Sequence, residues 1–484
     1  MKKFIRVLSL VLAVLMLSSM FVACGDTQQD NNGGNDATTV AGLDSMNWGG
    51  EEYRVLGRKE GEGNMFTNFE IDREEMSDDV VGQEVWNRNA NVMAKYGLDV
   101  VGTLDQSPAS TARVFLEAGD DQYDLMMLPT TSFQSFAMEG YLLNMNELDY
   151  IDFEKDCWNA YANEQLTMGG KLYYTVNKFS LHDKHRTWMV YYNRDLANEL
   201  NVGYLEDEVF AGTWTIDRLN EIAKQYAAEK DGVQGMSYND QWGVALSDQY
   251  GFVQLAFASG FRISANGSDG YPQLVGATDQ MLSILDKVYN ITADKNTCYI
   301  WTFRPDTEKP SGRLDNHIFA EGHAVVLVDV ISSFDDFKAA GVSFAFGTLP
   351  NPKYNEAQED YYSLPNTGNG TLFGVPATVY DPAKAGFGLQ ALSEESVDTS
   401  YKAYIETKCK LQDVYDEDGA KCLDIIFENV VYDILQITDA GGIGHVVNFE
   451  ISKEESNTYA RRFSSLEKRA NSELKKIKEA FAKY

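Results

Sequence analysis

The chain has 484 residues, and its 73 acidic and 41 basic side chains give a formal charge of −32 at pH 7. Such a surface repels nucleic acid and anionic lipid, so it argues against a nucleic-acid-binding protein and favours neutral or cationic ligands. The hydrophobic content of 44% is ordinary for a globular protein, and the length suits two or more domains.

The first 23 residues have the pattern of an export signal. Three basic residues stand among the first six, and an apolar run without ionisable side chains follows them. This pattern is typical of a secretory signal peptide, and the run is short for a membrane-spanning helix. The run ends in "LSSMFVACGD", which resembles a bacterial lipobox, although Phe21 stands where leucine is preferred. The resemblance implies that Cys24 is diacylated when residues 1–23 are removed, and an ordinary signal peptide cut elsewhere is the alternative.

Residues 24–47 are rich in Gly, Asn, Asp and Thr and contain almost no large apolar side chains. Such a segment buries too little surface to fold, so we expect a flexible tether. Two acyl chains on Cys24, such as palmitate, suffice for stable anchoring. The sequence therefore predicts a globular body, beginning near Trp48, that is lipid-anchored at the extracellular face of a cell membrane.

Strands and helices alternate in the first part of the body. The apolar patterns predict strands at 53–57, 98–102 and 123–129, separated by helices at 77–97 and 110–119. The first helix starts at a Ser/Asp cap and ends at Gly97. This alternation predicts an α/β fold with a largely parallel sheet covered on both faces.

The rest of the body continues in the same way. Strand-forming stretches are found at 169–181, 187–193, 241–246, 323–330, 342–350 and 370–380. Helical patterns are found at 194–202, 213–227, 251–260, 281–292 and 381–392, and in the last segment. Thr215 can cap the helix that follows it, and the last helix shows an apolar stripe from Phe463 to Phe481.

Eight segments between Tyr53 and Leu392 stand in a recognisable order. They are "YDLMMLP" followed by "GYLLNMNEL", "GGKLYYTV" followed by "VYYNRDL", "TWTIDRLNEIAKQYA", "FAEGHAVVLV", "FAFGTLPNP" and "GVPATVYDPAKAGFGLQAL". In this order they resemble the extracellular solute-binding proteins of bacterial ABC importers, in particular the family that includes maltose-binding protein. The lipoprotein form of such receptors is typical of Gram-positive bacteria, which lack an outer membrane.

The resemblance implies a two-lobed protein that closes on its ligand by a hinge motion. Each lobe is expected to hold a mostly parallel sheet flanked by helices, with the ligand cleft between the lobes. The implied division assigns 48–175 and 342–375 to the first lobe, and 176–341 and 376–484 to the second. The chain is then expected to cross between the lobes near 172–182, 332–342 and 372–378.

Polar residues that follow the predicted strands are the candidate ligand contacts. Ligands of open parallel sheets lie beyond the carboxyl ends of the strands. Thr130 and Thr131 follow the strand at 123–129 and offer hydroxyls to a neutral polar ligand, with a turn or helix cap as the alternative. Asp329 follows "HAVVLV" in the same manner.

The family resemblance adds further candidates. Asn177 stands where the family has a polar contact, and Asp248 and Tyr250 stand where it offers an acid and then an aromatic ring to a sugar. Asp183 and Arg186 lie in a stretch that is longer than the family pattern and are candidates on position alone.

The loop "YIWTFRPDTEKP" contains the last two candidates. Trp301 and Arg304 could form a stacking floor for a sugar ring, because the apolar face of a pyranose packs on aromatic rings, and plain packing of the tryptophan is the alternative.

Other chemistries are not supported by the sequence. His182 and His185 are close enough for a metal site, but no third ligand is evident. The four cysteines beyond Cys24 form no CxxC pair and are expected to be buried and free, with a disulfide between Cys409 and Cys422 as the alternative. No cofactor and no metal are expected. The basic run of the last helix is interpreted as a solvated face, with a permease-docking patch as the alternative.

These features together predict a membrane-tethered receptor that delivers a carbohydrate, in particular an oligosaccharide, to an ABC transporter permease. The receptor is expected to be a monomer and not an enzyme. A cell-surface glycoside hydrolase and a ligand sensor coupled to a membrane kinase are the alternatives, because paired carboxylates are available and a sensor would share this fold.

Overall fold

The computed structural model describes residues 42–59, 67–73, 79–305, 309–311, 314–366, 370–414 and 416–483. The predicted signal peptide, the lipidation site at Cys24 and the tether up to residue 41 lie outside the described residues. Leu43 is 7% exposed and packs in the hydrophobic core, within a short 3-10 helix η1 (Leu43–Ser45). The packed body was expected to begin near Trp48, and it begins a few residues earlier.

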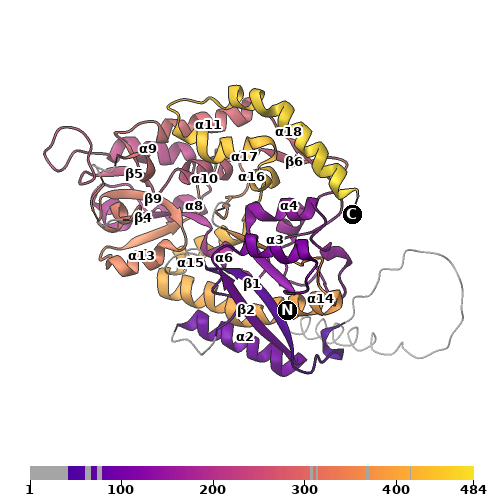
Figure 1. The fold of residues 1–484 in the computed structure, drawn as a ribbon. Coiled ribbons are helices and arrows are strands. Elements are labelled where there is room, and N and C mark those ends of the chain that lie inside the picture. Colours follow the sequence, from indigo (N-terminus) through magenta and orange to yellow (C-terminus); the bar gives the residue numbers. More distant parts are fainter. Residues whose placement is uncertain are drawn as a thin grey trace, which may run out of the picture. The chain divides into compact units, whose positions relative to one another are not determined.

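The smaller of two main sheets is built from the first strands of the body (Figure 1). Its strand order is β11-β3-β1-β2, with β1 (Glu51–Arg58), β2 (Leu98–Asp105), β3 (Leu125–Pro129) and β11 (Thr371–Gly374). The pairs β1–β2 and β1–β3 are parallel, and β11 runs antiparallel to β3. The predicted strand–helix–strand alternation is thus confirmed here.

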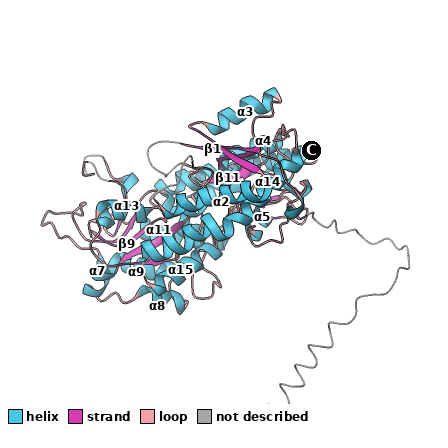
Figure 2. Cartoon of the chain, turned by 90° about the horizontal axis from the view of Figure 1, so that it is seen from below, coloured by secondary structure: helices cyan, strands magenta, loops and turns pink. Residues whose placement is uncertain are grey.

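Helices α2 (Val80–Tyr96) and α14 (Pro382–Ser396) lie side by side against the smaller sheet (Figure 2). Asp79 caps α2 by accepting the N–H of Gly82 at 2.8 Å, and Gly97 ends it with φ +62°. A Cβ at Gly388 would lie 2.2 Å from the Tyr53 ring, so glycine allows α14 to close on β1. The Tyr53 hydroxyl then donates to the Ala385 carbonyl at 3.0 Å. Helix α3 (Pro108–Ala118) also packs on this sheet.

The larger sheet has the strand order β10-β4-β9-β5-β8. Its strands are β4 (Trp188–Asn193), β5 (Trp242–Leu246), β8 (Cys298–Ile300), β9 (Ala324–Val330) and β10 (Phe346–Leu349). Strand β5 is parallel to β8 and β9, whereas β4 is antiparallel to both β9 and β10. The α/β fold is confirmed, but half of the strand pairs in this sheet are antiparallel, where a mostly parallel sheet was expected.

The remaining described elements surround the larger sheet or connect the two sheets. Their bounds are α4 (Phe133–Met138), α5 (Ala160–Leu166), α6 (His182–His185), α7 (Arg194–Glu199), α8 (Leu205–Phe210), α9 (Ile216–Tyr226), α10 (Tyr250–Ala258), α11 (Asp279–Thr292), α12 (His317–Ala320), α13 (Ser333–Ala340), α15 (Glu417–Glu428), α16 (Ile434–Thr438), α17 (Ile443–His445) and α18 (Tyr459–Phe481). A small hairpin joins β6 (Ser264–Asn266) and β7 (Pro272–Leu274), and π-helical turns run over Val397–Tyr401, Ala403–Val414 and Val446–Glu450.

Helix α9 shows why a predicted helix forms where it does. The Thr215 hydroxyl accepts the N–H of Arg218 at 3.3 Å, as an N-cap does. The apolar positions of the helix share one face and are all buried, namely Ile216, Leu219, Ile222, Ala223 and Tyr226. This face packs on β5, and α11 packs beside it.

The strand pairing revises the expected division into lobes. Residues 342–375 were all expected in the first lobe, but β10 pairs with β4 in the larger sheet and β11 pairs with β3 in the smaller one. The chain therefore changes sheets between β10 and β11, and the expected crossing at 332–342 is wrong because α13 connects two strands of one sheet. Helix α14, expected in the second lobe with 376–484, packs on β1 of the smaller sheet.

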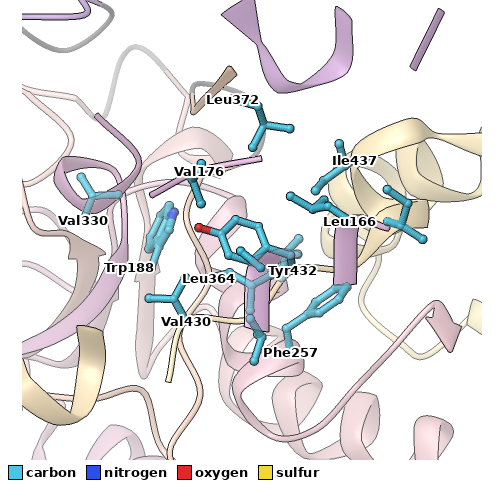
Figure 3. Packing of buried hydrophobic residues seen from close by; sticks show 14 of the residues in the cluster. Leu166, Val176, Trp188, Phe257, Val330, Leu364, Leu372, Val430, Tyr432 and Ile437 are labelled. Carbon is cyan, nitrogen blue, oxygen red and sulfur yellow. The ribbon is translucent and has the colours of Figure 1, made fainter. Parts of the chain in front are cut away.

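One hydrophobic cluster extends from the smaller sheet to the larger one (Figure 3). Figure 3 shows Tyr432 in the middle of this packing, with Trp188 and Val330 on one side and Ile437 and Leu166 on the other. The Tyr432 hydroxyl donates to the Asp183 carboxylate at 3.3 Å. The segment after α15 therefore fills the space between the strands of the two sheets.

The four described cysteines are free and buried, as expected, and Cys409 and Cys422 do not pair. Burial raises the pKa of Cys157, Cys298, Cys409 and Cys422, so these thiols behave as small apolar side chains. None of the helices in the described residues combines the length and the apolar character that crossing a bilayer requires.

Candidate ligand-binding site

Three predicted site residues come together at one edge of the larger sheet. Asp248 follows the end of β5, and Asp329 is the penultimate residue of β9, which runs parallel to β5. Strand β4 is antiparallel to β9, so Arg186, which precedes β4, lies at the same edge. Side chains from chain segments far apart in sequence therefore meet where the strand-end rule places a ligand.

Asp329 is held rigidly at this edge. Its carboxylate accepts hydrogen bonds from the Ser247 hydroxyl at 2.7 Å, the Ser333 hydroxyl at 2.6 Å and the N–H of Val330 at 2.8 Å. Burial raises the pKa of Asp329, and these donors together with Arg186 oppose that shift. The hydrogen bonds fix the position of this carboxylate before any ligand arrives.

Arg186 is the guanidinium of the cluster and is only 5% exposed. Its Nη1 donates to the Ser332 hydroxyl at 2.7 Å, and its Nε has no hydrogen-bond partner among the described residues. Burial lowers the pKa of Arg186, while four carboxylates raise it, namely Asp329, Asp248, Asp315 and Asp336. The guanidinium thus serves as the counter-charge for a group of acids.

Asp248 is partly buried beside this guanidinium. Its Oδ1 accepts the N–H of Tyr250 at 2.6 Å. Burial raises the pKa of Asp248 to about 7, with a further rise from the charge of Asp329, although the Tyr250 N–H and Arg186 oppose it. Near neutral pH this carboxyl therefore changes between its protonated and its charged form.

Two further acids belong to this cluster, Asp315 and Asp336, and neither was predicted from the sequence. Burial raises the pKa of Asp315, and the charges of Asp329 and Asp248 raise it further. Asp336, in the first turn of α13, accepts the Nδ2 of Asn316 at 2.8 Å. Asp315 belongs to no strand or helix, so no periodicity in the sequence marks it. Asp336 lies in the first turn of α13, where acids are common in any helix, so its position did not single it out.

Asn177 and Asp183 lie on the segment that passes between the sheets, and their polar atoms are already bonded within the protein. The Asn177 amide donates to the Ser393 hydroxyl at 2.6 Å and accepts the N–H of Phe179 at 2.9 Å. Asp183 forms a buried ion pair with Lys184 at 2.8 Å. These contacts hold the crossing segment in place, and a ligand contact at either residue stays a prediction.

Thr130, Thr131 and Tyr250 belong to elements that contact the chain segment after α15. Thr130 begins the 3-10 helix η2 (Thr130–Ser132), is buried, and donates its N–H to the Gly370 carbonyl at 3.2 Å, whereas Thr131 is exposed. Helix α16 contacts η2, and the π-helical turn at 446–450 contacts α10. The Tyr250 ring meets the Phe449 ring edge-on at 5.3 Å.

Arg304 is not brought together with the other candidates. Its guanidinium lies over the rings of Trp242 and Tyr299, at 4.8 and 5.0 Å from their centroids. Its Nη2 donates to the carbonyl of Lys295, which precedes β8, so the side chain reaches back toward the amino end of that strand. Trp301 follows β8 at the carboxyl edge, is partly buried, and has the Lys309 ammonium 5.4 Å from its ring centroid.

The two neighbouring histidines are buried. His185 lies 3.1 Å from the Tyr404 hydroxyl through its Nδ1, and burial lowers its pKa well below the usual range. Within the part of the chain that the structure describes, no group of three or more His, Cys, Asp or Glu side chains is arranged to hold a metal ion.

Comparisons with known proteins agree with this architecture. The chain is similar in fold to an ABC substrate-binding protein, Lmo0181, from Listeria monocytogenes in complex with cycloalternan, with 16% identity, a TM-score of 0.52, and coverage of 89% of this chain and 99% of the other. A cyclo/maltodextrin-binding protein complexed with maltotetraose gives 16% identity, a TM-score of 0.52, and coverage of 88% and 96%. The apo form of RafE from Streptococcus pneumoniae gives 14% identity, a TM-score of 0.51, and coverage of 90% of this chain and 97% of the other.

At these identities the structural likeness shows the fold, which is the two-lobed solute-binding fold. No curated protein sequence matches the chain. The family model described as "Bacterial extracellular solute-binding protein" matches residues 95–389, which is more than half of the 484 residues. The chain therefore belongs to the bacterial extracellular solute-binding proteins.

Proposed function

We propose that the protein is a receptor that binds a carbohydrate and delivers it to the permease of an ABC transporter. The observation that carries this proposal is the cluster of Arg186, Asp248 and Asp329 at the carboxyl edge of the larger sheet, in a chain of the solute-binding family. Carboxylates and a guanidinium with free hydrogen-bonding positions suit the hydroxyl groups of a sugar.

The fold neighbours support the sugar class. Two of them are described in complex with the saccharides cycloalternan and maltotetraose, and these two chains are covered almost completely by the likeness. An oligosaccharide is the ligand size that we infer for this protein as well. Binding would close the two lobes around the sugar, because contacts with both lobes favour the closed form.

A thermal-shift screen against mono- and oligosaccharides tests the proposal. A ligand present at 100 times its dissociation constant stabilises a protein by about 2.7 kcal/mol, which is an easily measured rise in Tm. We expect a rise with one group of saccharides, and Asp248→Asn should reduce it, whereas Asp120→Asn, at an exposed carboxylate on the smaller sheet's side, should not. No rise with any saccharide would refute the proposal.

The same sample separates a receptor from an enzyme. We infer that the protein does not change its ligand, which is consistent with its membership of a solute-binding family. Chromatography of the saccharide after a day of incubation should show only the starting compound. Release of shorter sugars would identify a glycoside hydrolase instead.

We further propose that the receptor is a monomer anchored to the outer face of the cell membrane through acylated Cys24. The lipobox-like ending of the signal supports this anchoring. Cells that express the protein should incorporate labelled palmitate into it, and Cys24→Ala should abolish the label and release the protein from the membrane fraction. Incorporation that survives the substitution would place the lipid elsewhere.

A further inference from the structure

The charges of the candidate site are unbalanced. One guanidinium, Arg186, interacts with four carboxylates from three separate parts of the chain, and within the described ranges Arg186 is the one cation among the main charges that act on Asp248 and Asp315. The nearest other described cation on the same segment, Lys184, is bonded to Asp183 and to the Asn177 carbonyl. Among the described residues, the acids of this cluster therefore outnumber its cations.

Two of the four carboxylates are committed to the protein. Asp329 accepts three hydrogen bonds, from Ser247, Ser333 and its own chain neighbour, and Asp336 accepts the Asn316 amide. The other two have unused oxygens as far as the described residues go, because Asp248 accepts one hydrogen bond there, from the Tyr250 N–H. No hydrogen bond to Asp315 is found among these residues. Hydrogen-bond acceptors are thus left over at the position where charge is in excess.

Two buried polar atoms of this cluster have no hydrogen-bond partner among the described residues. Arg186 Nε is a donor without an acceptor on a side chain that is 5% exposed. Asn316 Oδ1 is an acceptor without a donor on a side chain that is 1% exposed, and its amide nitrogen joins the cluster through Asp336. Unsatisfied buried groups are rare in native proteins because each loses its bonds to water. A molecule that both donates and accepts hydrogen bonds would satisfy them.

We propose that the ligand is a saccharide that carries a protonated amino group, with the ammonium held between Asp248 and Asp315 and with sugar hydroxyls bonded to Arg186 Nε and Asn316 Oδ1. An ammonium supplies donors to the two free carboxylates and offsets their repulsion. Acidic sugars are disfavoured by the same four carboxylates, and the net charge of −32 draws cations toward the protein. This inference rests on the proposed carbohydrate-receptor function.

Calorimetric titration with matched sugar pairs tests the inference. The probes are glucose and glucosamine, galactose and galactosamine, and cellotriose with the β-1,4-linked glucosamine trimer and its N-acetylated form. For at least one pair we expect the amino sugar to bind tenfold or more tightly than its neutral partner, since close charge pairs at interfaces couple by this much or more. The N-acetylated trimer, which has lost the charge, should bind like the neutral sugar.

Variants assign the preference to the two carboxylates. Asp248→Asn and Asp315→Asn should each lower the affinity for the amino sugar by a larger factor than the affinity for its neutral partner, and Asp120→Asn should leave both affinities unchanged. If one variant fails to fold, the other still decides the question.

Proton release on binding is a second test of the inference, and it needs no variant. Because Asp248 carries a proton in part of the population near pH 7, a bound ammonium should displace it. The heat of binding should then depend on the ionisation enthalpy of the buffer for amino sugars and not for neutral ones. Equal affinity for both members of every pair would overturn the inference and leave the carbohydrate receptor intact, whereas binding of no sugar at all would overturn both.

Discussion

Asp248 and Asp329 lie at neighbouring strand ends, but their environments give them different roles. Three donors fix Asp329, whereas Asp248 receives one backbone N–H and keeps an oxygen free. Burial acts on both carboxyls, so the one with fewer donors is the one expected to respond to pH and to ligand.

The raised pKa of Asp248 makes a testable contribution to stability. The folded-state value of about 7 lies above the usual 3.8, so the folded protein holds a proton between these pH values that the unfolded chain has lost. This group therefore stabilises the protein at low pH and loses that effect as the pH rises through about 7. We expect Asp248→Asn to flatten the decline of Tm between pH 5 and pH 8. A parallel decline in parent and variant would contradict the assignment, and Asp120→Asn is the control.

Arg186 should matter for stability as well as for binding. Arg186→Met would leave four carboxylates without their buried counter-charge, and breaking buried charge pairs of this kind costs about 3 kcal/mol or more. Urea denaturation at pH 7.5 should show this loss, and the loss should shrink at pH 5, where acids with raised pKa values take up protons. Arg461→Met, at a side chain that is 74% exposed, is the control and should change the free energy of unfolding little.

Part of the candidate site could be predicted residue by residue. The strand-end rule selected Asp329, and the family resemblance selected Asp248, which also follows a strand. Arg186 was a candidate on its position alone, and it stands just before β4. Asp315 could not be found in this way because it belongs to no strand or helix. Arg304 was predicted as a ligand contact because a tryptophan stands nearby. Its long side chain instead reaches back along β8 and stacks on Trp242 and Tyr299.

At the scale of elements, α9 and β5 approach each other closely at Gly243. A Cβ at this position would lie 2.4 Å from the Ile222 carbonyl oxygen and 2.5 Å from that of Ala223, and backbone atoms cannot move aside cheaply. We expect Gly243→Ala to destabilise the protein by about 3 kcal/mol, as measured by urea denaturation. Gly42→Ala, where a new Cβ meets nothing within 4 Å, should have a small effect. Equal effects of the two substitutions would show that the helix can shift away from the strand.

The helices and strands with clear periodicity were predicted well. The elements with which they pair or pack were not. The cap at Thr215 and the apolar face of α9 are local features that the sequence displays. The pairing of β10 with β4 joins residues more than 150 positions apart, and no local pattern specifies it. The π-helical turns at 403–414 and α15 were not predicted, since no element was assigned to that part of the sequence.

At the scale of the whole molecule, the charge of −32 sets how stability depends on salt. Like charges on one body repel each other, and dissolved ions screen that repulsion. We expect Tm to rise as NaCl increases from 10 mM to 300 mM. A steady fall over this range would mean that the surface ion pairs contribute more than the self-repulsion costs.

The two-sheet architecture followed from the order of segments, because that order is shared with the solute-binding family. The lobe boundaries did not follow from it. Strand β10 belongs to the larger sheet and α14 packs on the smaller one, whereas the opposite was expected for each. Strand order and helix packing depend on contacts between distant residues, and the sequence displays only the elements themselves.

The last helix, α18, packs at its two ends on different parts of the body. Near its start, the Tyr459 ring packs on Phe261, which follows α10, and near its end the Phe481 ring packs on Tyr173, with the Phe481 carbonyl accepting a hydrogen bond from the Lys171 ammonium at 2.8 Å. Its C-terminal part also contacts α4, beyond β3 of the smaller sheet (Figure 1). Phe481 is fully buried at the end of this helix of 23 residues, so the helix is held at both ends. The proposed hinge motion would therefore have to break the contacts at one of the two ends. A fluorescent dye attached beside Lys483 would report a loss of the Phe481 contacts as a change in brightness, which would turn the protein into an optical sensor for its ligand.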